Sequence, residues 1–203
     1  MLYRRLVLAA PLSLAACGSV LPKQKYVPRT VWPLQPAPNT AAQAGKGPVL
    51  LVRAVNPAPG LEQRGLQSLT ADGNLLVDYY NLWAVPPAEA VTQGLVTWAQ
   101  ASGLFSAVVT PGSRLTPGLI AEGELSELLV DVPANMARVR MTLLVIKPSA
   151  ASGGFARPLA QVKLAANAPV QGSGAAAQAA AQNAAVAKLL GDAVEQLSRF
   201  AGH

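Results

Sequence analysis

The chain has 203 residues, of which 51% are hydrophobic and 13% charged, so it has enough apolar sequence for one packed domain and is not disordered throughout. The excess behind its net charge of +6 lies in the first 47 residues, which contain no acidic residue, whereas ten basic and ten acidic residues follow from Pro48 onward. This distribution argues against a nucleic-acid-binding domain and favours an anionic membrane surface beside the N-terminus.

The N-terminus predicts a lipoprotein signal peptide over residues 1–16. Two arginines precede an apolar run from Leu6 to Ala16, which is shorter than the roughly 20 residues that a transmembrane helix needs. The motif Leu14-Ala15-Ala16-Cys17 resembles the lipobox of bacterial lipoproteins. In that pathway the Cys17 thiol receives a diacylglycerol, the peptide is cut before it, and the new N-terminus is acylated. Several acyl chains anchor a protein stably. A cleaved signal with an unmodified cysteine is the alternative.

Residues 17–47 are predicted to be the lipidated cysteine followed by a flexible tether rich in proline and alanine, without an apolar period. Tyr26 and Trp32 are unusual in a spacer. They would dock on the domain, sit among lipid headgroups, or have no special role. Residues 48–203 are predicted to form a single domain.

The first half of that domain reads as strands around one helix. Asp72-Gly73 suits the tight turn of a hairpin. Pro86-Pro87 opens a helix that ends near Ser102, because Gly103 suits the position after a helix. The predicted strands are Val49–Val55, Gly65–Thr70, Asn74–Trp83 and Leu104–Val109.

The second half reads as a long hairpin, a last strand and a helix. The alternation of apolar residues slips near Ser126-Glu127, which predicts a bulge, and acidic residues of the first arm can pair with Arg138 and Arg140 of the second. Pro158 places the last strand at an edge or a bulge. The predicted elements are the arms Leu119–Val132 and Met136–Ile146, the strand Phe155–Ala166, and a helix from Ala175 to Phe200 that packs on the core or, through its Ala-rich half, on another subunit.

Catalytic chemistry has few candidates in this sequence. The sole histidine is His203, at the end of the chain, and the sole cysteine is the predicted lipidation site. Histidine- or cysteine-based metal sites and cofactor motifs are therefore not expected. Glu122, Glu124 and Glu127 could support acid–base hydrolysis, but we expect a solvated face paired with arginines. The sequence predicts a protein that is not an enzyme.

Residues 77–91 carry the most specific pattern in the chain. A strand with Tyr79 and Tyr80 leads through Trp83 to a helix that starts at Pro86-Pro87, and Gly103-Leu104-Phe105 enters the next strand. This pattern, together with the order of predicted elements, resembles the ABC-type transport auxiliary lipoproteins, which include the paraquat-inducible and MCE-associated lipoproteins.

The resemblance implies an α+β fold, an antiparallel sheet with two helices packed on it. It also implies a non-enzymatic lipoprotein on the periplasmic face of the outer membrane, which self-associates and serves an MCE protein and an ABC transporter that move lipids between membranes. Tyr79, Tyr80, Trp83, Pro86 and Pro87 are the candidate partner-binding residues, with Trp83 more suited to the core. A pilotin-like lipoprotein that serves an outer-membrane assembly is the alternative function.

Overall fold

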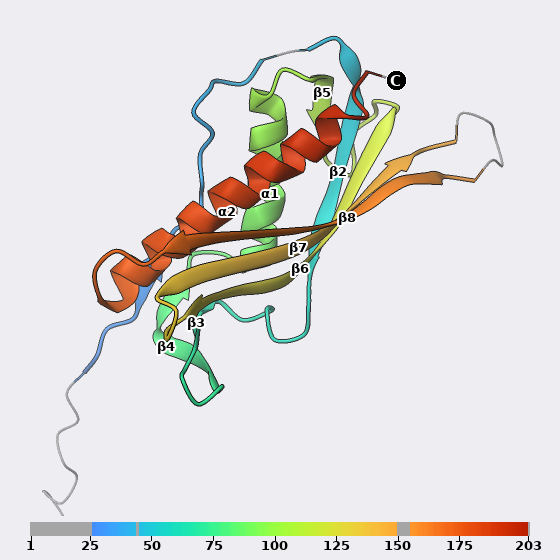
Figure 1. Cartoon of the computed structure of the whole chain (residues 1–203). Helices are drawn as coiled ribbons and strands as arrows, with labels where there is room; N and C mark the ends of the chain where they lie inside the picture. The colour runs from blue at the N-terminus through green and yellow to red at the C-terminus, as the bar shows by residue number, and fades with distance from the viewer. Residues whose placement is uncertain (1–25, 44, 150–154, 203) are drawn as a thin grey trace, which may run out of the picture.

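The computed structural model describes residues 26–43, 45–149 and 155–202 (Figure 1). The predicted signal peptide and Cys17 lie outside these residues. The elements in chain order are β1 (Thr30–Trp32), β2 (Gly47–Pro57), β3 (Gly65–Leu69), β4 (Leu75–Trp83), α1 (Pro87–Ala101), β5 (Phe105–Val109), β6 (Leu119–Asp131), β7 (Met136–Lys147), β8 (Arg157–Pro169) and α2 (Gly174–Ser198).

The eight strands form one mixed sheet in the order β1-β4-β3-β6-β2-β5, while β7 pairs with the other edge of β6, and β8 with β7. The long strand β6 holds two parallel neighbours on one edge, β2 along its first half and β3 at its end. Only β3–β4, β6–β7 and β7–β8 are antiparallel. The expected α+β class is confirmed, but the sheet is not wholly antiparallel. The parallel pairs β2–β5, β2–β6 and β3–β6 are connected through α1, which lies between β4 and β5, whereas β1 and β4 are connected through β2 and β3.

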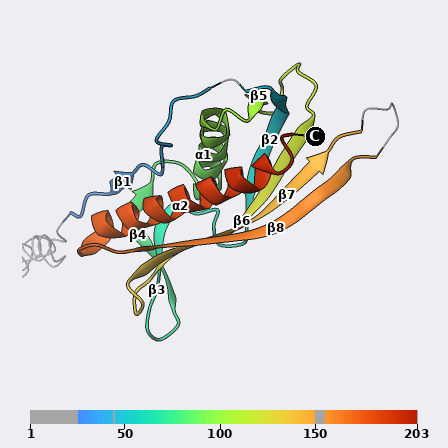
Figure 2. The same ribbon diagram turned by 45° about the horizontal axis from the view of Figure 1, so that its top comes forward.

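Both helices pack on the sheet, as predicted, and they also pack on each other. α1 lies against β2 and β5, and α2 crosses β7 and β8 (Figure 2). The core between them is apolar, and the inward side chains of β7, from Ala137 to Val145, are at most 1% exposed. The Ala-rich half of α2 buries Ala179, Ala181 and Ala185, because small side chains let the helix approach its neighbours closely. In the described part of the chain, no helix is both long and apolar enough to cross a membrane.

Several local features agree with the predictions. Gly73 has a φ of 78° in the β3–β4 turn, and Gly103 has a φ of 65° just after α1. The register of β6 against β7 shifts between Leu125 and Glu127, at the predicted bulge. The register of β7 against β8 also shifts, beside Pro158. In the described part of the chain β8 pairs only with β7, so Pro158 lies both in an edge strand and at an irregularity, as predicted.

The segment predicted as a tether differs, because its second half is docked on the domain. β1 pairs in parallel with the end of β4. Leu34 is 1% exposed, the Trp98 indole donates a hydrogen bond of 2.8 Å to the Pro36 carbonyl, and the Gln43 amide donates one of 3.0 Å to the Gln100 carbonyl. We call residues 33–43 the strap. It runs from the β1 end of the domain towards β2, so this part of the predicted tether belongs to the domain.

Candidate functional site

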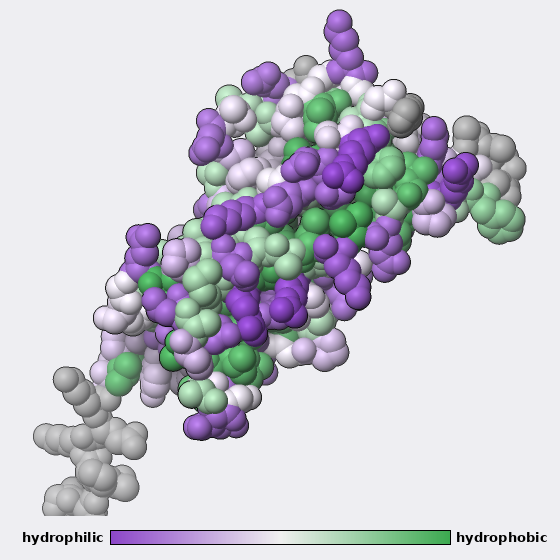
Figure 3. Space-filling model, viewed as in Figure 1, coloured by the Kyte–Doolittle hydropathy of each residue, from purple (hydrophilic) through white to green (hydrophobic). Residues whose placement is uncertain are grey.

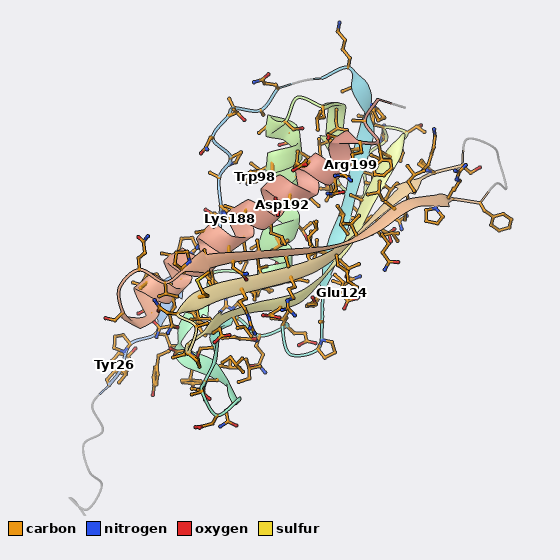
Figure 4. The ribbon with its side chains drawn as sticks, in the orientation of Figure 1. Tyr26, Trp98, Glu124, Lys188, Asp192 and Arg199 are labelled. Carbon is orange, nitrogen blue, oxygen red and sulfur yellow. The ribbon has the colours of Figure 1, made fainter. Side chains whose placement is uncertain are left out.

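The edge of the sheet formed by β1 and β4 carries most of the exposed large apolar side chains of the described residues. The members are Tyr26, Val27, Val31, Leu75, Leu76, Val77, Tyr79 and Tyr80. We call this set the edge patch. Exposed apolar residues scattered singly are ordinary, but a group of them along two paired strands is a candidate interaction site. In Figure 4 the labelled Tyr26 lies at the end of the domain where β4 and the β3–β4 hairpin lie.

A bulge in β4 presents the two tyrosines. The pairing of β4 with β3 shifts register between Gly65 and Gln67, and Asp78 fills the interruption. Its carboxylate accepts hydrogen bonds from the backbone amides of Tyr80 (2.7 Å) and Asn81 (3.0 Å) and from the Asn81 side-chain amide (2.8 Å). These hydrogen bonds replace the backbone hydrogen bonds that β4 does not make with β3 at the bulge. They therefore fix the backbone conformation of the two tyrosines.

The protonation of Asp78 follows from the same contacts. Partial burial raises the pKa of its carboxyl, but the hydrogen bonds from the Asn81 side chain and from the Tyr80 and Asn81 backbone outweigh burial and lower the pKa below its ordinary value. Asp78 is therefore a carboxylate at neutral pH and accepts all three hydrogen bonds.

Tyr79 and Tyr80 lie on the same exposed surface. Their rings meet edge to face with centroids 5.2 Å apart, and the Arg29 guanidinium carbon lies 4.1 Å above the Tyr79 ring. Tyr79 is 65% exposed and Tyr80 43%. Strict alternation along a strand predicts that neighbouring side chains point to opposite faces, and that expectation is wrong here because the bulge interrupts it. The result is an aromatic pair with a cation at its rim.

The other three predicted partner-binding residues do not share this exposure. Trp83 is 1% exposed, Pro87 is buried, and Pro86 is half-buried at the start of α1. Trp83 donates its backbone amide to the Arg64 carbonyl (2.6 Å) and lies in the core, as expected for that residue. These three residues join β4 to α1 and so position the edge patch.

Sequence reasoning missed Asp78, Arg29 and the aliphatic members of the edge patch. Asp78 accepts hydrogen bonds from the backbone amides of the residues two and three positions after it. An aspartate in such a local turn is a sequence pattern that could have indicated the bulge. Arg29 approaches Tyr79 only because β1 pairs with β4. No local pattern in the sequence indicates that contact.

Two of the three acidic residues considered for hydrolysis, Glu122 and Glu127, serve as ion-pair partners. Glu122 binds Arg53 (2.6 Å), and Glu127 binds both Arg138 (2.7 Å) and Arg140 (3.4 Å) across the β6–β7 ladder. The predicted pairing with Arg138 and Arg140 is confirmed for Glu127, whereas Glu122 pairs with Arg53 of β2 instead. Glu124 lies on the exposed side of β6 (Figure 4). Within the described ranges, no group of three His, Cys, Asp or Glu residues could hold a metal ion.

The family model of the ABC-type transport auxiliary lipoprotein component matches residues 32–194. Similar crystal structures include a Xanthomonas campestris protein of the family DUF330 (18% identity, TM-score 0.69, covering 81% of this chain and 92% of that one). Another is an uncharacterized protein (15%, 0.59, 84% and 99%), and a third a hypothetical protein from Chlamydia trachomatis (9%, 0.52, 76% and 96%). At these identities the likeness shows the fold. No curated protein matches the sequence significantly.

Proposed function

Because the chain belongs to the family of ABC-type transport auxiliary lipoprotein components, we propose that it is a non-enzymatic accessory lipoprotein of an MCE-type ABC system. In this role it is anchored through Cys17 to the periplasmic face of the outer membrane. It binds the periplasmic MCE protein and so helps to move lipids between the two membranes.

The observation that carries this proposal is the edge patch. Tyrosines, exposed aliphatic side chains and a rim arginine are the composition of a protein-binding surface rather than of a reaction site. The Asp78 bulge holds the tyrosines in place before any partner arrives, so little conformational entropy is lost on binding. Tyr79 and Tyr80 contact the partner protein. Trp83, Pro86 and Pro87 do not contact it, but hold the junction between β4 and α1 in place.

The position of the edge patch also suits an anchored protein. Tyr26 belongs to the patch and lies nine residues after Cys17. Even fully extended, nine residues reach only about 30 Å. A lipid on Cys17 would therefore keep the edge patch close to the outer membrane, where a periplasm-spanning partner would have to end. Arg29 beside Tyr79 would face an acidic or aromatic group of that partner.

The test is recovery of the lipoprotein from membranes under mild detergent, with identification of what it binds. The variant Tyr79→Ser with Tyr80→Ser is compared with the parent and with Leu115→Ser, which removes an exposed apolar side chain outside the edge patch. We expect the parent and the Leu115 control to retain an MCE protein and the double variant to lose it. Deletion of the lipoprotein should also sensitise cells to membrane-stress agents.

Three results would contradict this function. The first is an outer-membrane pore assembly in place of the MCE protein, which would favour the pilotin-like alternative. The second is retention of the MCE protein by the double variant, which would move the contact away from the edge patch. The third is normal resistance to membrane stress in the deletion strain.

A further inference from the structure

Two groups of cations among the described residues differ in whether they have a carboxylate partner. Arg53, Arg138 and Arg140 form ion pairs with glutamates on the outer side of the sheet. A second group, formed by Lys46, Lys147, Arg157 and Arg199, has no carboxylate partner among the described residues and lies at the end of the domain away from the edge patch. Figure 4 labels Arg199 at that end and Tyr26 at the other. Unpaired cations gathered at one end create a local positive potential.

A cavity of about 340 Å³ opens among these cations. It is lined by the first residue of β6, the last of β7, the start of β8 and the chain just after α2. The lining residues are Gly118, Leu119, Lys147, Arg157, Leu159 and Phe200. We call it the distal pocket. Its volume falls at the lower end of the usual range for small-ligand sites, about 300–1,000 Å³.

The backbone places the two cations of the distal pocket opposite each other. Lys147 and Arg157 are register partners in the antiparallel β7–β8 ladder, so they flank one point at the mouth. Both side chains belong to exposed residues, and the pocket lining contains no acidic residue. Glu195, the nearest acid along α2, is exposed and does not line it. Two unneutralised cations at one point favour an anion with several acceptor oxygens.

The remaining wall is apolar. Leu119 is buried, and Leu159 and Phe200 are half-buried and pack on the core. Figure 3 shows a hydrophobic stretch between the C-terminal half of α2 and β8, with hydrophilic side chains beside it. Phe155, two residues before Arg157, is 96% exposed. A free phosphate ion would use the two cations and leave this apolar wall against water, whereas an acyl chain would cover it.

We infer that the distal pocket binds an anionic lipid, with its phosphate or carboxylate between Lys147 and Arg157 and the first part of an acyl chain against Leu119, Leu159 and Phe200. This inference deepens the proposed function and rests on it for its biological meaning, because it makes the protein itself a lipid carrier or acceptor. The pocket lies at the end of the domain opposite the edge patch, so a bound lipid and a bound partner would not compete for one surface.

The test uses site-specific photo-crosslinking of the full lipoprotein in intact cells labelled with radioactive phosphate. A photoreactive phenylalanine replaces Phe200, which keeps an aromatic ring in the wall. The same group at Tyr80 reports lipid near the edge patch. We expect labelled phospholipid on the protein from position 200. Lys147→Ala with Arg157→Ala should reduce that label about tenfold, which corresponds to a loss of about 1.4 kcal/mol of binding free energy.

The matched control is Lys163→Ala with Lys188→Ala, which removes the same charge from β8 and α2 outside the pocket. We expect it to leave the label at position 200 unchanged. A mass increase equal to a fatty acid, without radioactive phosphate, would support the site with a carboxylate as its anion. No adduct at position 200, or an equal loss in both double variants, would overturn the inference. Partner recovery through the edge patch is measured separately, so either proposal can fail alone.

Discussion

Replacing Asp78 with alanine should loosen the edge patch while leaving the rest of the domain folded. The change removes three hydrogen bonds that hold the bulge. Buried hydrogen bonds to a charged group contribute about 1.5–3 kcal/mol each, but Asp78 is half-exposed and water replaces part of the loss. We therefore expect a total destabilisation of about 1–2 kcal/mol, or a fall in Tm of roughly 2–8 °C for a domain of this size.

The assay for Asp78→Ala is chemical and thermal unfolding, combined with amide hydrogen exchange. Exchange should accelerate at Tyr80 and Asn81, whose amides lose their acceptor. The environment of the Trp32 indole should also change, because it donates to the side-chain oxygen Oδ1 of Asn81 (3.2 Å). The control is Asp192→Ala, which removes an exposed carboxylate from α2. Stability within about 0.3 kcal/mol of the parent, with unchanged exchange at both amides, would refute the role given to Asp78.

The lowered pKa of Asp78 predicts that the difference in stability between the parent and Asp78→Ala depends on pH. The folded pKa of Asp78 is lowered, so its stabilising contribution is complete above the unfolded value of about 3.9 and is lost as the pH falls through the folded pKa. The difference in stability between the parent and Asp78→Ala should therefore be constant near neutral pH and shrink in the acid range. A difference that grows on acidification would contradict the sign of this linkage.

Four further substitutions test the packing. Gln182 is 0% exposed and both polar atoms of its amide lack a partner among the described residues, so Gln182→Leu should raise the free energy of unfolding by about 1 kcal/mol; a loss would point to a bridging water. A Cβ at Gly94 would lie 2.7 Å from a buried leucine methyl group, but one at Gly191 has ordinary contacts. The free energy of unfolding should therefore be higher for Gly191→Ala than for Gly94→Ala by about 1 kcal/mol or more. Equal free energies of unfolding would show that the leucine side chain moves to accept the added methyl group at little cost. Trp98→Phe removes the hydrogen bond to the strap, so proteolysis within the strap should accelerate, and unchanged cleavage would mean that other contacts hold it.

Local features of the fold could be read from the sequence. The Asp72-Gly73 turn, the helix that begins at Pro87 and ends before Gly103, and the slip at Ser126-Glu127 all appear where expected. Each depends on the conformational preference of one or two residues or on a short period of apolar side chains. The family also followed from such a stretch, residues 77–91, and the family model matches it.

Long-range partners could not be read in the same way. The strap is fixed by Trp98 and Asn183, which bond to residues 62 and 148 positions earlier, so a proline-rich segment without an apolar period became part of the domain. The parallel pairing of β2 with β6 and the gathering of Lys147, Arg157 and Phe200 around one cavity likewise bring together distant parts of the chain.

The sequence by itself determined the class of fold, the family and the positions of most elements, because these depend on local conformational preference and apolar periodicity. It also singled out Tyr79 and Tyr80. Only the tertiary structure decided that both tyrosines face outward while Trp83 is buried, since the Asp78 bulge breaks the alternation that sequence reasoning assumes. It likewise decided which cations find a carboxylate, because that depends on strand register across the whole sheet.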